Sequence, residues 1–328
     1  MAHLSVADNA PLFIILNAGS GHNDMAETCA AIESVLTEAA REHELILVDD
    51  PAKLAAVAKS TVEKAQARQG VVVMGGGDGS INTVAQAVLG SGCPFGILPQ
   101  GTFNLFARAH GIPLDTAEAT RILLGSTAEA VDVGLVNDQV FLVNASMGMY
   151  PQVLQDRETW KGKYGRNRVV AFLAGILTLM QQHRQVHLTT LEKDGKPGHI
   201  RTPTLFVCIN DYQLRETGIL ADEESLAPGQ MMAVTVRPLS ALGLLWLMVC
   251  GTFGKLGEAE NIVSFQFENL SITRAGNFRT RTVRVAADGE LFWLSLPLEF
   301  RIAPQPLYLL KPDAAQEAIP EQSLSKAA

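Results

Sequence analysis

The first third of the chain alternates continuous apolar runs with segments of helical periodicity. After the apolar run at residues 71–74, Ile81, Val84 and Val88 recur at the spacing of one helix face until Gly90. That spacing and the closing glycine predict an amphipathic helix. The same alternation predicts strands and helices at 12–16, 24–41, 45–48, 51–67 and 95–98. Apolar strands that alternate with helices predict an α/β domain with a parallel sheet over residues 1–130.

The pattern changes after this first domain. Short strand-like runs follow, including 131–136, 200–209 and 262–272, and turn sequences separate many of them. We therefore predict a β-rich, largely antiparallel second domain over residues 131–312, with two apolar helices inserted at 169–180 and 239–250. One version of this prediction has the last strands of the second domain pair with the sheet of the first domain. Residues 313–328, rich in Ala, Gln, Glu and Ser, are expected to form a flexible tail.

Composition narrows the class of protein. Of 328 residues, 47% are hydrophobic and 18% are charged, which is typical of a globular chain. The formal net charge of -8 argues against nucleic-acid binding, which usually leaves a basic footprint. Both apolar helices are shorter than the roughly 20 residues of a membrane span. The four cysteines form no CxxC pair and no signal-peptide pattern is evident, so we expect a cytoplasmic protein.

Small polar loops follow three of the predicted strands, at residues 17–21, 75–79 and 101–104. The carboxyl ends of parallel strands meet at one edge of a sheet, where ligands bind. Glycine lets backbone N–H groups approach an anion, and the following helix adds a positive N-terminal dipole. Three such loops predict a phosphate site. Within it, the Asp78 carboxylate fits a magnesium ion or an acceptor's hydroxyl proton, although an isolated Asp-Gly is more often a plain turn.

Five motifs, in order, resemble the catalytic domain of the diacylglycerol kinases, a family related to sphingosine, ceramide and bacterial lipid kinases. The segment Gly75-Gly-Gly-Asp-Gly-Ser-Ile-Asn82 resembles the family's GGDGT-x-N signature. The other four are Asn17-Ala-Gly-Ser-Gly21 for NPxSG, residues 96–108 for GILPxGTxNDFAR, Val131-Asp-Val-Gly134 for IDxG, and Asp288-Gly-Glu290 for a late DGE. The resemblance runs from about residue 12 to residue 312, which is nearly the whole chain.

The resemblance implies an ATP- and Mg²⁺-dependent kinase that transfers the γ-phosphate to a lipid hydroxyl. It also implies a nucleotide domain, a β-rich acceptor domain and ATP in the cleft between them. Eight residues would bind the nucleotide: Asn17, Ser20, Gly75, Gly76, Gly77, Gly79, Thr102 and Asn104. Asp78 and Asp132 would organise magnesium. Asp78, Asp288 and Glu290 would be catalytic, with Asp288 or Glu290 as general base, because phosphoryl transfer needs alignment, charge neutralisation and a proton acceptor.

The chain departs from the family pattern at several positions. Thr83 stands where an acidic residue is usual, and Ala227-Pro-Gly229 replaces an Asp-Asp-Gly turn that helps hold a structural magnesium in many bacterial members. We therefore do not predict that structural metal, although Asp222 is a partial substitute. Three milder replacements are Ala18, Ser80 and Leu105.

Basic residues flank the first apolar helix, which suits an anionic lipid surface. They include Lys161, Lys163, Arg166, Arg168 and Arg184. We hypothesise a peripheral contact with the inner face of the membrane. The alternative, a core helix whose charged flanks face solvent, fits the same residues equally well. A homodimer through an antiparallel edge strand is a further hypothesis.

Two other functions stay open. A GGDG loop also occurs in NAD kinases, so a soluble NAD kinase-like enzyme fits the early motifs, whereas residues 96–108 and the late Asp-Gly-Glu fit the lipid kinases better. A nucleotide-binding protein of the same fold without turnover is motivated by Thr83 and Ala227-Pro-Gly229. A phosphofructokinase would need a TIDND-type segment, which the sequence lacks.

Overall fold

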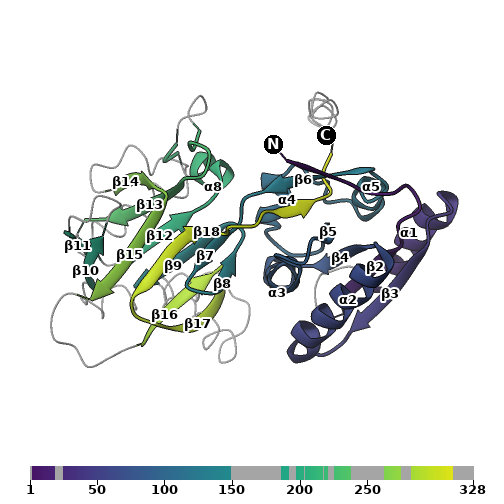
Figure 1. Ribbon diagram of the computed structural model, residues 1–328, viewed down its shortest axis with the longest axis horizontal. Helices are drawn as coiled ribbons and strands as arrows, with labels where there is room; N and C mark the ends of the chain where they lie inside the picture. Colours follow the sequence, from purple (N-terminus) through teal and green to yellow (C-terminus); the bar gives the residue numbers. More distant parts are fainter. Residues whose placement is uncertain are drawn as a thin grey trace, which may run out of the picture. The chain divides into compact units, whose positions relative to one another are not determined.

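The chain divides after Val131. One unit comprises Met1–Val131 with Gln305–Ala328, and the other comprises Asp132–Pro304 (Figure 1). The structure is a computed structural model. The residues that it describes are 2–18, 25–148, 186–191, 197–202, 204–216, 218–220, 225–237, 262–274 and 282–312.

A seven-stranded, mostly parallel sheet forms the centre of the first unit. Its strand order is β1-β6-β19-β5-β4-β2-β3, and only β6 and β1 join it antiparallel. The strands are β1 (His3–Ser5), β2 (Leu12–Asn17), β3 (His43–Val48), β4 (Val71–Gly76), β5 (Pro94–Pro99), β6 (Thr127–Val131) and β19 (Leu307–Leu309). Every residue of β2 and of β4 is buried, which is why their sequences are unbroken apolar runs. The predicted parallel sheet is confirmed.

Helices link the parallel strands of this sheet. They are α1 (Met25–Glu38), α2 (Leu54–Arg68), α3 (Asp78–Val88), α4 (Leu105–Ala109) and α5 (Thr116–Ile122). The predicted apolar face of α3 is buried, with Ile81 and Val84 at 0% exposure and Val88 at 2%. α1 packs with α5, and α2 packs with α3.

The last described strand belongs to the first unit. β19 lies between β5 and β6, with Leu309 opposite Phe95 on one side and opposite Glu129 on the other (Figure 1). Beyond it, Lys311 Nζ lies 2.7 Å from Glu129 Oε2. The strand thereby joins the antiparallel β1–β6 pair to the parallel part of the sheet.

Two six-stranded sheets with antiparallel pairing form the second unit. Their orders are β11-β10-β15-β18-β7-β8 and β14-β13-β12-β9-β16-β17. The elements are β7 (Gly134–Val136), β8 (Gln139–Phe141), β9 (Asn144–Gly148), β10 (Val186–Leu191), β11 (Pro197–Thr202), β12 (Thr204–Cys208), α8 (Asp211–Glu216), β13 (Met231–Val236), β14 (Ile262–Phe267), β15 (Asn269–Arg274), β16 (Thr282–Ala287), β17 (Glu290–Ser295) and β18 (Leu298–Ile302). Their apolar faces share one core that includes Phe141, Val207 and Phe300. The predicted antiparallel β-rich region is confirmed.

Some long predicted strands are each two strands. The predicted strand 131–136 is interrupted after Val131, because β6 pairs in the first unit and β7 in the second. The predicted strand 262–272 is interrupted at Glu268, because β14 and β15 pair in different sheets. The two predicted apolar helices, the flanking basic cluster and the tail lie outside the described residues. No helix among the described residues is long and apolar enough to cross a membrane.

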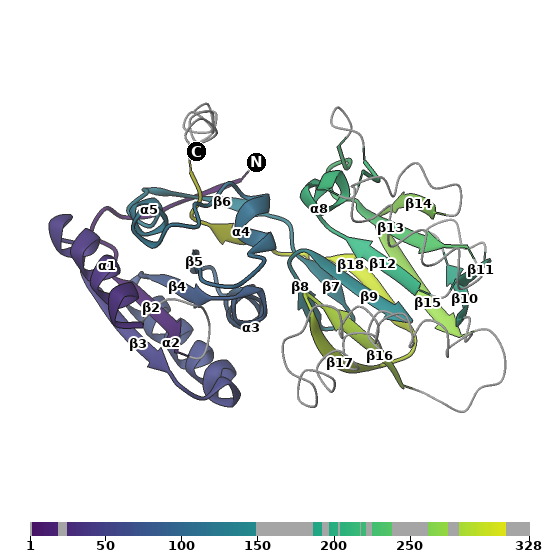
Figure 2. The same ribbon diagram turned by 180° about the vertical axis from the view of Figure 1, so that it is seen from behind.

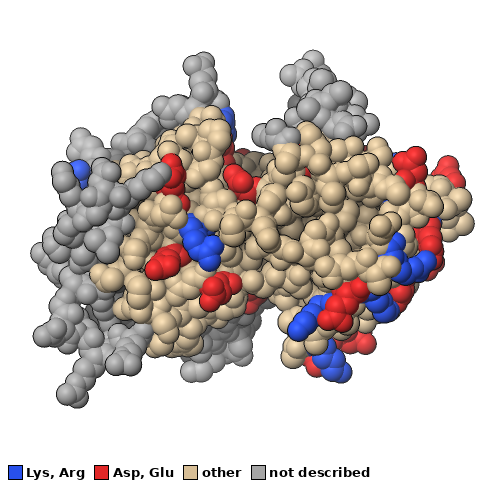
Figure 3. Space-filling model, viewed as in Figure 1, with Lys and Arg blue, Asp and Glu red and all other residues tan. Residues whose placement is uncertain are grey.

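Charged side chains of both signs mix on the described surface of α2 and β3, at the lower right of Figure 3. Lys64 pairs with Glu44 and Arg68 pairs with Glu42, each at 2.8 Å, and all four side chains are about half exposed. Exposed pairs of this kind contribute about 0–1 kcal/mol. This part of the surface is therefore a solvated face and not a basic patch.

Candidate functional site

The three predicted phosphate loops begin at neighbouring strand ends. β2, β4 and β5 are adjacent and parallel, with Leu16 opposite Gly75 and Gly76 opposite Pro99. The loops that follow them therefore start at the same edge of the sheet. Asn17, the last residue of β2, donates a hydrogen bond from Nδ2 to Ser80 Oγ at 2.8 Å. This bond links the carboxyl end of β2 to α3, the helix that follows β4.

The loops after β4 and β5 meet backbone to backbone. A Cβ atom on Gly101 would lie 2.7 Å from Gly77 Cα, and one on Gly77 would lie 3.3 Å from Gly101 Cα. The N–H of Gln100 also donates to the carbonyl of Gly76 at 2.9 Å. A side chain on Gly101 would clash here, so glycine lets the two loops pack backbone to backbone at the edge where the phosphate site is predicted.

The remaining predicted glycines of the second loop also make room for packing. Gly75 and Gly76 end the buried strand β4. A Cβ on Gly75 would lie 2.4 Å from Leu16 Cδ2, and one on Gly76 would lie 2.9 Å from Ser80 Cβ. Gly79 lies in the first turn of α3, and its carbonyl accepts a hydrogen bond from Thr83 Oγ1 at 3.0 Å. Thr83, which replaces an acidic residue, thus bonds within its own helix.

Asp78 is the first residue of α3, where the helix dipole favours a carboxylate. Its side chain is half-buried, and Oδ1 accepts a hydrogen bond from the N–H of Phe106 at 3.3 Å. Within the part of the chain that the structure describes, Oδ2 has no recorded hydrogen-bond partner. The carboxylate therefore joins the second loop to α4 and keeps an acceptor oxygen for a cation or a proton.

Asn104 holds the third loop in shape. It adopts a left-handed backbone conformation, with φ of 51°, and is 6% exposed. Its Oδ1 accepts from the N–H of Gly101 at 2.8 Å, and its Nδ2 donates to the carbonyl of Gly101 at 3.0 Å. Both side-chain groups are therefore engaged with the loop itself, whereas neighbouring Thr102 is exposed.

Gln100 is a residue of this edge that sequence reasoning missed. Its Nε2 atom is buried and finds no hydrogen-bond partner among the described residues. A buried donor left unpaired costs about 1–3 kcal/mol, so its position invites an acceptor supplied by a ligand. Nothing in the sequence around Gln100 marks it, because only the fold determines that its amide is buried.

The late Asp-Gly-Glu motif is a tight hairpin turn between β16 and β17 (Figure 2). Ala287 pairs with Glu290, and Asp288 and Gly289 have φ values of 47° and 88°. Two central residues with positive φ are what a two-residue hairpin favours. The Asp288 carboxylate accepts hydrogen bonds from the backbone N–H groups of residues 142 and 143, between β8 and β9, and of residue 144, the first of β9. Glu290 is exposed.

The other predicted polar residues do not form a metal cluster that the structure describes. Ser20 and Asp222 lie outside the described residues. Asp132 is exposed and directly follows β6. Ala227-Pro-Gly229 is a turn closed by a hydrogen bond of 3.0 Å from the N–H of Gln230 to the carbonyl of Ala227. No group of three His, Cys, Asp or Glu residues that could hold a metal ion occurs among the described residues.

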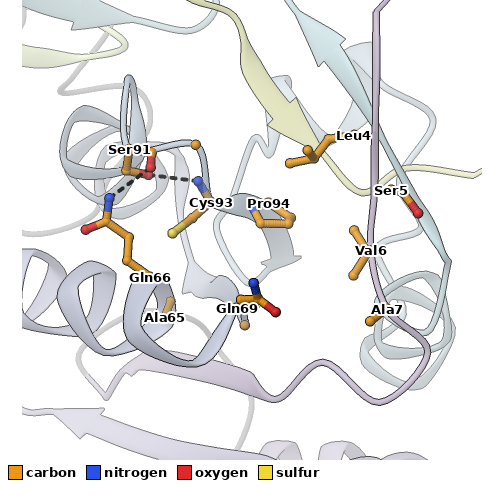
Figure 4. Close-up of a pocket in the computed structure, with 12 residues that line it drawn as sticks. Leu4, Ser5, Val6, Ala7, Ala65, Gln66, Gln69, Ser91, Cys93 and Pro94 are labelled. Atoms are coloured by element: carbon orange, nitrogen blue, oxygen red, sulfur yellow. Dashed lines mark hydrogen bonds between the residues drawn. The ribbon is translucent and has the colours of Figure 1, made fainter.

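A cavity of about 440 Å³ lies at the opposite edge of the first unit's sheet (Figure 4). Gly70 and Pro94, at the amino ends of β4 and β5, contribute to its lining, together with Val6, Gln69 and Cys93. Burial raises the pKa of the Cys93 thiol above its ordinary value, so this thiol stays protonated at neutral pH. The cavity includes none of the predicted site residues.

The first unit is similar to a known catalytic domain. Residues 11–136 match the family model described as the diacylglycerol kinase catalytic domain. The matched segment contains Asn17, the Gly75–Gly79 loop and the Gly101–Asn104 loop. It confirms the resemblance that these motifs indicated.

Individual proteins extend the similarity. A Synechocystis protein is 26% identical over 253 residues, which is 74% of this chain and 54% of that protein. A Serratia proteamaculans protein named as a YegS-like lipid kinase is 30% identical over 174 residues, which is 52% of this chain and 55% of that protein. The chain thus spans about half the length of these relatives.

A solved structure shares the fold over nearly the whole chain. The crystal structure of a Bacillus anthracis protein assigned as a diacylglycerol kinase matches 93% of this chain and 98% of its own, with a TM-score of 0.69 and 17% sequence identity. At this identity, the match supports the fold and not the substrate.

Proposed function

We propose that this chain is an ATP- and Mg²⁺-dependent kinase that phosphorylates the hydroxyl of a lipid, because residues 11–136 match the family model described as the diacylglycerol kinase catalytic domain. The observation that carries the proposal is the backbone contact between Gly77 and Gly101 beside Asp78. It supports a site in which N–H groups from two loops and a helix N-terminus face a polyphosphate. The YegS-like relatives, which are named lipid kinases, support the lipid acceptor.

The residues at this edge fit the phosphate groups of a nucleotide. The buried Nε2 of Gln100 has no partner among the described residues, so it can donate to a phosphate oxygen. Asn17, Gly77, Gly79 and Thr102 would bind the nucleotide with it, and Asn104 would act by holding its loop. Ser20 remains part of this proposal from the resemblance alone.

The carboxylates fit a magnesium ion that is bound mainly by the nucleotide. Mg²⁺ usually keeps several waters and takes one or two carboxylates together with substrate phosphates. Asp78, with an open oxygen, and the exposed Asp132 would supply these carboxylates. When bound, the ion would neutralise charge on the transferring phosphoryl group.

The test is transfer of γ-labelled phosphate from Mg-ATP to diacylglycerol, sphingosine, ceramide and phosphatidylglycerol in mixed micelles. We expect one labelled lipid, and we expect Asp78→Asn to lower kcat about a hundredfold or more, because the charge at the phosphate edge is lost. Glu63→Gln, an exposed carboxylate change on α2, is the matched control and should leave the rate unchanged.

NAD belongs in the same panel as a soluble acceptor. Label on NAD and on no lipid would replace the lipid kinase proposal by an NAD kinase-like one. Mg-ATP binding by calorimetry without transfer to any acceptor would favour a nucleotide-binding protein without turnover, the reading that Thr83 and Ala227-Pro-Gly229 motivate. Peripheral membrane contact and a homodimer remain separate proposals, which vesicle sedimentation and sedimentation velocity would test.

A further inference from the structure

Two large apolar side chains stand exposed on one strand of the second unit, β17. Trp293 is 66% exposed and Leu291 is 37% exposed. β17 is the last strand in the order of its sheet and pairs with β16 in an antiparallel hairpin (Figure 2). Arg284 on β16 is opposite Trp293, and its Cζ lies over the indole ring, 4.7 Å from the ring centroid. We call these three side chains the β17 patch.

The core of the second unit holds the hairpin in place. Phe292 and Leu294 pack against that core. Because side chains along a strand alternate between the two faces of a sheet, Leu291 and Trp293 point away from it. The β17 patch is therefore presented on a supported sheet surface and not on a loop.

The outer face of the hairpin carries a single charge. Arg284 is the only basic residue in the two described strands, and it shares the face of Trp293, its cross-strand partner. Glu290, the only acidic residue of these strands, falls on the opposite face by alternation. The β17 patch thus combines exposed apolar surface with a positive charge and no carboxylate from either strand.

The size of the β17 patch argues against a protein partner. Trp293 and Leu291 together expose on the order of 200 Å² of apolar surface. A stable protein–protein interface covers about 800 Å² on each partner. Pairing of β17 with a second copy would use the backbone groups at its edge. Such pairing would leave the Trp293 side chain uncovered, because strand side chains stand roughly perpendicular to the sheet.

The chemistry of the β17 patch fits the surface of a lipid bilayer. Tryptophan is enriched at the level of the headgroups, because its ring is apolar and its indole N–H is polar. An arginine beside it attracts anionic headgroups. Surface binding of this kind scales with apolar area plus electrostatic attraction, and it needs no partner of complementary shape.

We propose that the β17 patch docks the chain on an anionic bilayer, with the Trp293 ring at the level of the headgroups and Arg284 at a lipid phosphate. This inference rests on the proposed lipid kinase function, because a kinase of membrane lipids meets its acceptor at a bilayer. It assigns the contact to a sheet surface of the second unit. The sequence alone directed attention to the basic residues at 161–168, which lie outside the described residues.

The first experiment follows Trp293 itself. In a full chain that carries Trp160→Phe and Trp246→Phe, Trp293 is the only tryptophan. We expect vesicles of phosphatidylglycerol and phosphatidylcholine in equal parts to shift its emission to shorter wavelength, and acyl-brominated lipids in them to quench it. Vesicles of phosphatidylcholine alone should have a smaller effect, because they lack the negative charge. Emission that neither vesicle changes would overturn the proposal.

Vesicle sedimentation tests the β17 patch by substitution. We expect Trp293→Ala to weaken binding to the mixed vesicles about tenfold or more, and Arg284→Gln about fivefold, each with an unchanged Tm. Leu47→Ala, at a leucine of β3 that is 53% exposed, is the matched control and should bind as the wild type does. Full binding by Trp293→Ala, together with lost binding after the basic residues at 161–168 are neutralised, would assign docking to that segment instead.

Docking and turnover give separate readouts, because vesicle binding is measured without ATP. A chain that binds anionic vesicles through Trp293 but labels no acceptor would overturn the proposed function and support the docking surface. A chain that labels a lipid in mixed micelles but does not bind anionic vesicles would overturn the docking surface alone. A dimer in sedimentation velocity that Trp293→Ala dissociates would assign the β17 patch to a second copy, and would also overturn the proposal.

Discussion

His110 shows how a single residue couples the fold of the first unit to pH. Its ring packs edge-on against Phe106, with 4.6 Å between ring centroids. Burial, assisted by the nearby charge of Lys311, lowers the pKa of His110 to about 4, although Glu129 acts in the opposite direction. The histidine is therefore neutral in the folded chain at physiological pH.

The shifted pKa predicts that stability falls on acidification. Between pH 6.5 and about 4, the unfolded chain binds a proton at His110 that the folded chain does not, so lower pH favours unfolding. We expect His110 to remove about 2–3 kcal/mol of stability across this range, measured by urea unfolding at steps from pH 7 to pH 4.5. His110→Gln should flatten this part of the profile. An equal slope in the variant would assign the acid sensitivity to other groups.

The identities of the site residues were easier to predict from the sequence than the contacts that their side chains make. The glycines at Gly77 and Gly101, and Asp78 at the start of a helix, follow from the strand–loop–helix pattern and from the family motifs. Asn104 and Gln100 were harder, because left-handed backbone and a buried amide depend on the packing around them. The bonds of Asp288 to Leu142–Asn144 join distant parts of the chain, and local pattern carries no information about them.

Among the elements, the β7–β8 hairpin is fastened to its neighbours by one turn residue. Asn137 has φ of 55°, its Oδ1 accepts from the N–H of Glu299 at 2.8 Å, and its Nδ2 donates to the carbonyl of Ser295 at 2.9 Å. Its N–H also donates to the carbonyl of Glu299. The turn thus continues the pairing of β7 with β18.

Replacing this residue should weaken the second unit. We expect Asn137→Ala to lower the free energy of unfolding by about 2–4 kcal/mol, since two side-chain hydrogen bonds are lost and alanine is strained at positive φ. Asn137→Gly loses the same bonds without the strain and should cost about 1 kcal/mol less. Urea unfolding of both variants measures the difference, and equal losses would show that the positive φ contributes nothing.

Strands were predicted well as apolar runs and less well as separate elements. Periodicity located β2, β4 and β5, because strands buried on both faces are unbroken apolar runs. The same periodicity predicted β6 and β7 as one strand, and β14 and β15 as another. The strand-like pattern of the sequence continues across the one or two residues that separate each pair. Only the pairing partners, which lie in different sheets, separate them.

For the whole molecule, the position of β19 makes the first unit depend on residues beyond the second. Without β19, the β1–β6 pair would lose its only recorded neighbour in the described sheet, and β5 would become an edge strand. We expect a chain truncated after Pro304 to lose the first unit's cooperative unfolding and the Mg-ATP binding proposed for that unit. The second unit, which is continuous in sequence, should keep its own transition.

A chain truncated after Pro312 is the matched control, because it retains β19. Urea unfolding monitored by hydrogen exchange would report a separate transition for each unit. It would thereby distinguish loss of the first unit from loss of the second. Retention of exchange protection in β5 and β6 by the shorter chain would show that the first unit does not need this strand.

The place of β19 also sets an order of events during synthesis. The ribosome releases the strands of the first unit early, and the strand that fits between β5 and β6 comes only after the entire second unit. Until then, β5 and β6 present unpaired edges, which are sites for wrong partners and for chaperones. Nascent chains would therefore complete the sheet of the first unit only after residues 307–309 have been made, and products that stop earlier would expose these edges to proteases.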